Sequence, residues 1–228
     1  RDPMAFDHLN RAFDEEMDQL NALVAQLGGL AESMIRDSVE ALRRGDHDLA
    51  TEVIVRDKQL DAIEAEIEKL AIQTIALRQP VAGDLRQIVA AFKISGMLER
   101  VGDHAKNIAR STLKISNGRL AHAAKVPPMA DIALGMIHSA LDAFAARDSG
   151  LAADVVERDE AVDALYKDLV RALIEHLSQP EPQVVAATEL MLVARFIERI
   201  GDNATNIAEA VYYAVVGQNL PDRHKTPG

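Results

Sequence analysis

The sequence predicts an all-α protein made of two tandem three-helix bundles, six helices in total. Hydrophobic residues make up 48% of the chain but aromatic residues only 4%, and Trp is absent, a composition that favours helices over sheets. Apolar residues recur at spacings of three and four, which is the period of a helix with one buried face. An eleven-residue segment occurs at 99–109 and again at 198–208, with eight of eleven positions identical, which indicates an internal duplication.

The first repeat is expected to hold three long helices. The apolar stripe of the first helix runs straight through Gly28 and Gly29, so we expect one helix with a weak point rather than two helices. Gly45 ends that helix, and the side chain of Asp46 can cap the next one. Pro80 ends the second helix, because the residue before a proline is disfavoured in helical conformation. The expected helices span about residues 6–42, 46–78 and 83–117.

The second repeat is expected to follow the same plan. Pro127 and Pro128 close a linker, Asp148 takes the capping role of Asp46, and Pro180 ends the middle helix. The expected helices span about residues 129–146, 148–177 and 182–216. Short connections between amphipathic helices produce up-down-up bundles. The predicted units are a first repeat at 4–118, a linker at 119–128, a second repeat at 129–216 and a disordered tail at 217–228.

Composition and charge narrow the classes of function. The net charge is -11 and the pI about 5.1, so phosphate backbones and anionic lipid surfaces are repelled, and nucleic acid is not an expected partner. The absence of Cys excludes thiolate metal sites and disulfides. No apolar run of membrane-spanning length and no signal-peptide core is evident, so we expect no membrane insertion and a cytoplasmic location.

Each repeat carries two pairs of acidic residues spaced by four positions. One pair lies on the middle helix and one on the last helix, and residues at i and i+4 share a helix face. Each pair sits one position from the apolar stripe, so packing of the two stripes would bring four carboxylates together. The expected metal ligands are Asp57, Asp61, Glu99 and Asp103 in the first repeat, and Asp159, Asp163, Glu198 and Asp202 in the second.

Four adjacent carboxylates need compensating charge, because like charges repel and burial adds a desolvation cost. One source is a salt-bridge network formed by the arginines that lie beside the acids, which are Arg56, Arg100, Arg158 and Arg199. The other is a cation. Oxygen ligands without thiolate suit Mg, Mn, Ca or Fe, and carboxylates can bridge several ions.

Other features are weaker. Gly102 and Gly201 lie inside helices, which indicates close helix approach; the same closeness would let carboxylates from two helices share ions. Arg86, Lys93 and Arg100 recur every seven residues and form either a solvated face or a surface for an acidic partner or phosphate. No catalytic motif is found, so we expect no enzyme; a carboxylate-bridged hydrolase or oxidase is the rival hypothesis.

Three stretches carry a resemblance to a known family. They are Glu-Arg-Val-Gly-Asp-His-Ala at 99–105, Glu-Arg-Ile-Gly-Asp at 198–202 and Gln-Pro-x-x-x-Asp-Leu-Arg at 79–86. With the two acid pairs upstream and the chain length, they resemble the PhoU family of phosphate-signalling proteins. The resemblance covers about residues 4–216.

The resemblance implies a six-helix protein with multinuclear Fe, Mn, Zn or Mg clusters on the eight carboxylates. It implies a negative regulator that acts between the ATPase of a phosphate-specific ABC transporter and a sensor histidine kinase, commonly as a homodimer. A relative that regulates a different phosphate permease is the alternative. Two departures are Asn203, where the family usually has His, and Gln183-Val184-Val185, where the second repeat lacks the Asp-Leu-Arg element.

Overall fold

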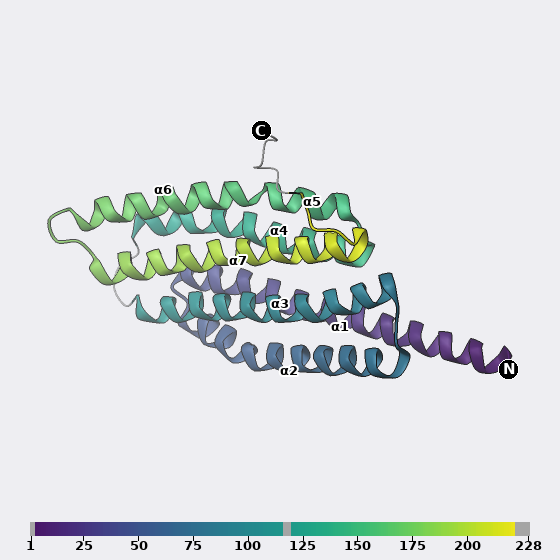
Figure 1. Cartoon of the computed structure of the whole chain (residues 1–228). Helices are drawn as coiled ribbons and strands as arrows, with labels where there is room; N and C mark the ends of the chain where they lie inside the picture. Colours follow the sequence, from purple (N-terminus) through teal and green to yellow (C-terminus); the bar gives the residue numbers. More distant parts are fainter. Residues whose placement is uncertain (1–2, 116–119, 222–228) are drawn as a thin grey trace, which may run out of the picture.

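The protein is a two-layered assembly of long helices, as expected from the sequence. The computed structural model describes residues 3–115 and 120–221, with side chains from Arg11 onward, and these residues contain seven α-helices, one 3-10 helix and no strand. The elements are α1 (Pro3–Arg44), α2 (His47–Arg78), α3 (Ala82–Lys114), η1 (Ala121–Lys125), α4 (Val126–Ala146), α5 (Ser149–Glu157), α6 (Asp159–Leu177) and α7 (Val184–Val216). The bundle of α1, α2 and α3 lies against the bundle of α4 to α7 (Figure 1).

Helix ends follow the predicted signals. The carboxylate of Asp46 accepts a hydrogen bond from the backbone N–H of Leu49 at 3.0 Å and caps α2. The carboxylate of Asp148 caps α5 in the same way, by accepting from Gly150 N at 2.9 Å and from Leu151 N at 3.0 Å. Gly217, with φ of 77°, ends α7 in the left-handed conformation that glycine tolerates.

The middle helix of the second repeat spans the expected residues but is interrupted once. It is divided at Arg158 into α5 and α6, which continue one another (Figure 1). The N–H groups of Arg158 and Ala161 each bond three residues back, at 3.1 Å, so one turn is tightened there.

The helix α4 begins three residues earlier than expected, at Val126. Pro127 and Pro128 lie in the first turn of α4, where the missing proline N–H groups would have had no helical partner. The helix η1 occupies most of the expected linker. The expected end of the third helix, at 117, and residues 222–228 of the expected disordered tail lie outside the described residues.

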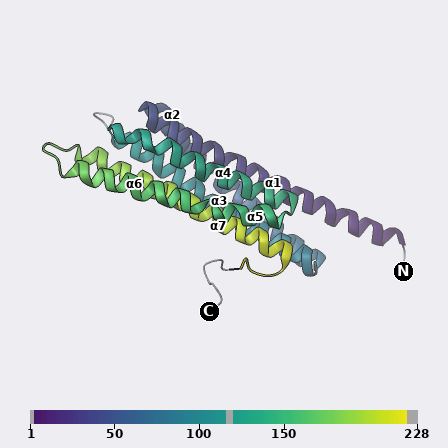
Figure 2. The same ribbon diagram turned by 90° about the horizontal axis from the view of Figure 1, so that it is seen from above.

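The two repeats share one core. The helices α3 and α7, which carry the duplicated segment, pack against each other through the middle of the molecule in both views (Figures 1 and 2). The helix α3 also contacts α1 and α2, and α7 also contacts α4, α5 and α6. Both central helices carry fully buried aliphatic side chains, among them Ile94, Leu98 and Ile108 of α3 and Ile197, Ile200 and Ile207 of α7. The duplicated segments are therefore held between the bundles.

The helix α1 runs without a break through Gly28 and Gly29, as expected. A Cβ added at Gly28 would collide with the side chain of Leu141 on α4, whereas nothing lies within 4 Å of one added at Gly29. Gly28 thus permits close contact between helices of the two repeats. The amino-terminal turns of α1 project beyond the other helices (Figure 2).

One segment has the length and apolar composition of a membrane span, contrary to the expectation from the sequence. It is Ala121–Ala146, which comprises η1 and α4. Within the fold this segment contributes to the core, because Met129, Met136 and Ile137 have no exposed surface and α4 packs against α1 and α7. Its apolar composition is explained by that burial.

Candidate functional site

The four predicted carboxylates of the first repeat come together between α2 and α3. The ammonium of Lys106 donates to Asp57 Oδ2 at 2.6 Å and to Asp103 Oδ1 at 2.5 Å, so these two acids from different helices lie on either side of one cation. Burial raises the pKa of Glu99 to about 7, and the nearby charges of Asp103, Glu64 and Asp61 act in the same direction. We call this group the first cluster.

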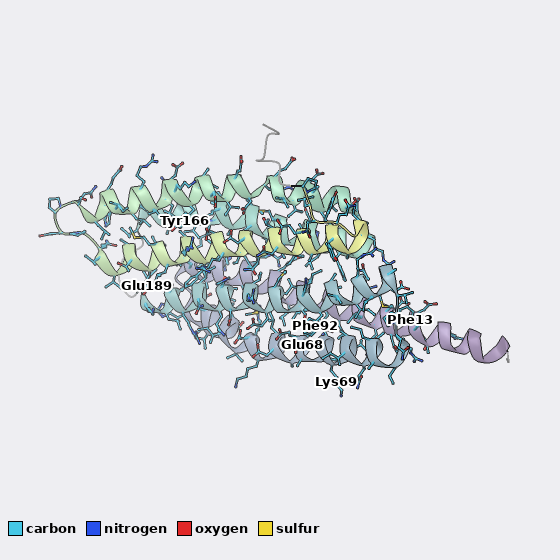
Figure 3. The ribbon with its side chains drawn as sticks, viewed as in Figure 1. Phe13, Glu68, Lys69, Phe92, Tyr166 and Glu189 are labelled. Atoms are coloured by element: carbon cyan, nitrogen blue, oxygen red, sulfur yellow. The ribbon has the colours of Figure 1, made fainter. Side chains whose placement is uncertain are left out.

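A fifth carboxylate, Glu64, belongs to the first cluster and was not predicted. It is half-buried on α2, and a Cβ added at Gly96 of α3 would lie 3.6 Å from its Oε1. Burial raises the pKa of Glu64, with further contributions from Glu68 and Asp61. The sequence held a signal for it, because Glu64 follows Asp61 by three residues and extends the same acidic row toward Glu68. Figure 3 labels Glu68 on α2.

The four predicted carboxylates of the second repeat also converge, between the start of α6 and the middle of α7. Burial raises the pKa of Asp159 to about 6, and the charges of Asp163 and Asp202 add to the shift. Burial raises the pKa of Glu198 as well, again with contributions from Asp202 and Asp163 that outweigh the opposing arginines. We call this group the second cluster. Its Glu198 Oε2 is buried and has no hydrogen-bond partner among the described residues.

The two clusters differ in where their counter-charge lies. Thr205 takes the place of Lys106 in the second repeat, and Arg195 takes the place of Gly96. Arg195 Nη1 donates to Glu198 Oε1 at 2.8 Å, and its guanidinium lies 6.0 Å from the ring centre of Tyr166, which replaces Glu64. Where the first cluster has the additional carboxylate of Glu64, the second therefore has the ring of Tyr166 and the guanidinium of Arg195. Tyr166 is labelled on α6 in Figure 3.

The arginine network, which was the alternative to a bound cation, does not form around either cluster. Arg56 pairs with Asp37 on α1, and Arg158 Nη1 donates to Ser139 Oγ at 3.0 Å. In the described part of the chain, Arg100 and Arg199 make no ion pair with a carboxylate. The cations that pair with cluster carboxylates are instead Lys106 and Arg195, while Arg199 acts on Glu198 without pairing with it.

The donor chemistry of both clusters suits a hard metal ion. Carboxylate oxygens are the ligands that Mg and Mn prefer, and the unpaired Oε2 of Glu198 is a free donor. Within residues 3–115 and 120–221, no three Asp, Glu or His side chains are already gathered around one point as metal ligands. In the first cluster, the ammonium of Lys106 stands between Asp57 and Asp103, where an ion would have to compete with it.

The glycines of the duplicated segment bring the paired helices close together. A Cβ added at Gly102 would lie 2.6 Å from Leu60 Cδ1 of α2, which is fully buried. At Gly201 an added Cβ would lie 3.2 Å from Asp159 Oδ1. At both glycines the helices that hold the carboxylates therefore lie close together. This confirms the prediction that Gly102 and Gly201 permit close helix packing.

The raised pKa values predict that the metal-free protein loses stability as pH rises. The pKa of Glu99 rises from an ordinary value of 4.5 to about 7, and that of Asp159 from 3.8 to about 6. The folded state then binds more protons than the unfolded state between those values, so stability falls across pH 4.5–7 and 3.8–6 respectively.

Thermal unfolding in chelator at about pH 5, 6 and 7.5 checks this, and Glu99→Gln is expected to flatten the upper part of the decline. Glu66→Gln, on an exposed position of α2, is the control. A melting temperature that rises steadily with pH in this window would contradict the prediction.

Comparison with known proteins agrees with the duplication. A family model described as the PhoU domain matches residues 24–112 and again 126–211. The phosphate-specific transport system accessory protein PhoU homolog of Zymomonas mobilis is 42% identical over 217 residues, covering 95% of this chain and 92% of that protein. The accessory protein PhoU of Escherichia coli K12 is 33% identical over 214 residues, covering 93% and 89%.

Solved structures with the same fold are also known. The crystal structure of PhoU from Pseudomonas aeruginosa matches with a TM-score of 0.87 and 34% identity, over 90% of this chain and 100% of that one. The phosphate transport system regulatory protein PhoU from Streptococcus pneumoniae matches with a TM-score of 0.86 and 26% identity, over 92% and 99%.

Proposed function

This chain belongs to the PhoU family, and from that membership we propose that it is a negative regulator of phosphate uptake and of the phosphate-starvation response. The observation that carries the proposal is the agreement of both repeats, and most of the chain, with a family whose members are named as accessory proteins of a phosphate transport system. Repression of starvation genes when phosphate is plentiful is our inference.

The proposed partners are the ATPase of a phosphate-specific ABC transporter and a sensor histidine kinase, both reached from the cytoplasm. The names of the relatives support the link to the transport system. The helices offer long exposed faces for such contacts, and we also propose a homodimer. No enzymatic activity is part of the proposal, because the relatives are named as accessory or regulatory proteins of a phosphate transport system.

We further propose that the two clusters bind metal ions, several per site and of the Mn, Fe, Zn or Mg type. Support comes from the convergence of carboxylates on paired helices in both repeats and from the raised pKa of Glu99 and Asp159, which a cation would relieve. In this scheme Asp57, Asp61, Glu99 and Asp103 hold metal in the first cluster. Elemental analysis after purification without chelator measures it, and a protein that neither holds nor takes up Mn, Fe or Mg would contradict the proposal.

A phosphate-starvation reporter tests the regulatory role. Deletion of the gene in its source bacterium is expected to give high alkaline phosphatase activity in phosphate-rich medium, and complementation with the intact gene should restore repression. Persistently low reporter activity in the deletion strain, with no related gene to cover the loss, would contradict the proposal. Co-purification of a different phosphate permease would redirect the proposal to that transporter.

The same assay can ask whether the first cluster matters for repression. A variant with Asp57, Asp61, Glu99 and Asp103 changed to Ala is expected to fail in complementation. The matched control replaces four exposed acids outside the clusters, which are Asp18, Glu66, Asp154 and Asp168. Equal repression by both variants, at equal protein level, would show that the first cluster is not needed for regulation.

A further inference from the structure

The duplicated segments face each other across the contact between α3 and α7. In each segment the two acids lie toward the middle helix of their own repeat. The arginine next to the glutamate, Arg100 or Arg199, lies toward the segment of the other repeat. An open pocket of about 370 Å³ is found there, between the two repeats. It is lined by Arg100, Asp103 and His104 from α3 and by Arg199, Asp202, Asn203 and Asn206 from α7. Arg100 and Arg199 occupy equivalent positions of the duplication, so the pocket brings two like residues together.

Neither guanidinium group of this pocket makes a hydrogen bond or an ion pair in the described part of the chain, although Arg199 lies near enough to Glu198 to act against the raised pKa of that residue. Other arginines of the same helices are engaged: Arg86 Nε donates to Ala214 O at 3.2 Å, Arg110 Nη1 donates to Asn107 Oδ1 at 3.2 Å, and Arg195 pairs with Glu198. Both Arg100 and Arg199 lie near enough to His104 to lower its pKa, although burial is the larger cause. Two cations that share a pocket repel each other, and an anion between them would remove that cost.

The acids at the edge of the pocket are turned toward the clusters. Asp103 accepts a hydrogen bond from Lys106, which also pairs with Asp57, so the charge of Asp103 is partly compensated from the side of the first cluster. Asp202 lies near Asp159 of the second cluster, where its charge contributes to the raised pKa of that residue. The polar donors left for a ligand are the two guanidinium groups and the amide of Asn206. His104 adds an imidazole whose buried Nδ1 has no hydrogen-bond partner among the described residues.

The positive charge continues along the same side of α3. Arg86 and Lys93 line a neighbouring groove of about 330 Å³ together with one acid, Glu209. Asn206 lines both that groove and the arginine pocket. The heptad row noted in the sequence therefore runs along the contact with α7 rather than over a fully solvated face. Arg86 is tied to the last turn of α7, which leaves Lys93 as the exposed cation closest in sequence to Arg100.

We propose that the pocket between Arg100 and Arg199 binds a small oxyanion of the phosphate class. Each guanidinium can donate two parallel hydrogen bonds to such an anion, which is the geometry that arginine offers and lysine does not. The site joins the two repeats, and its two arginines are not among the proposed metal ligands, although Asp103 and Asp202 of the clusters also line the pocket. It stands on the geometry of the pocket and does not depend on the regulatory role.

Isothermal titration calorimetry with inorganic phosphate tests the proposal. The protein is first treated with chelator, so that phosphate held through a bound metal does not contribute. We expect saturable binding at one site per chain, and each of Arg100→Gln and Arg199→Gln should weaken it roughly tenfold to hundredfold, the effect of losing a charged hydrogen-bond donor. Arg171→Gln, an exposed arginine of α6 outside the pocket, should bind as the unchanged protein does.

Three further titrations, with a lysine variant, with sulfate and with ATP, test which features of the anion and of the arginines matter. Arg199→Lys is expected to bind with intermediate affinity if the planar fork of arginine matters. Sulfate should compete with phosphate, since both present tetrahedral oxygens. Titration with ATP distinguishes a free anion from the phosphate group of a larger molecule. The proposal is overturned if no saturable phosphate binding occurs below about 10 mM, a very weak affinity. Binding that survives both glutamine substitutions, or binding of ATP but not of phosphate, would overturn it as well.

Discussion

Replacement of Lys106 by Met is expected to destabilise the metal-free protein by about 1–3 kcal/mol and to make its stability more dependent on divalent cations. The side chain of Lys106 is only 14% exposed and that of Asp57 16%, so the ion pair between them is well shielded from solvent. Removing one partner from a buried ion pair costs several kcal/mol. The 43% exposure of Asp103 reduces that cost here.

The measurement is chemical denaturation in chelator and again with added Mn²⁺. Manganese should restore more stability to the Lys106→Met variant than it adds to the unchanged protein, because the ion no longer competes with an ammonium between Asp57 and Asp103. Lys69→Met is the control: Lys69 is exposed on α2 (Figure 3) and should change stability little. An equal loss in both variants, or a manganese effect no larger than in the unchanged protein, would contradict this account of Lys106.

The substitution Gly102→Ala is expected to destabilise the protein by about 1–2 kcal/mol, although Ala is the better helix former. Ala in a helix interior gains about 1 kcal/mol over Gly. At this position the new methyl would lie 2.6 Å from Leu60 Cδ1, and Leu60 is fully buried, so the helices must separate or the side chain must leave its rotamer. Overpacking of that kind costs about 1–3 kcal/mol.

The second repeat supplies the matched control for this substitution. At Gly201 the nearest atom to an added methyl is Asp159 Oδ1 at 3.2 Å, on a side chain that can turn, so Gly201→Ala should be close to neutral. Gly29→Ala, with no atom within 4 Å, should stabilise by about 1 kcal/mol. Combining Gly102→Ala with Leu60→Val should recover part of the loss through coupling of neighbouring residues. Destabilisation at Gly201 equal to that at Gly102 would contradict the packing argument.

The helices and their ends followed from local rules, which is why they could be predicted. Apolar spacing marks the buried face, and capping at Asp46 and Asp148 depends only on residues within one turn. The break at Arg158 and the placement of Pro127 in α4 were missed, because Arg is an ordinary helix former and proline is tolerated in a first turn.

The candidate site was predicted only in part. Periodicity placed two acid pairs on one face each, and their convergence in both repeats followed from packing of the apolar stripes. Glu64 was not predicted because it follows Asp61 by three residues, whereas the predicted acid pairs are spaced by four. The roles of Lys106 and Arg195 could not be predicted, since each depends on how its helix is rotated in the bundle, which the sequence leaves open.

By itself the sequence determined the duplication, the helical architecture and the set of acids that face the middle helices, because these depend on residue identity and on a fixed helical period. Only the tertiary structure decided which neighbouring helix is contacted by the side chains at the edges of the buried helix faces. Arg100 is next to Glu99 in the chain, but one residue is a rotation of about 100° around a helix. Because α3 packs between α2 and α7, the two side chains lie in different environments. Glu99 lies at the first cluster, and Arg100 lies at the pocket shared with Arg199.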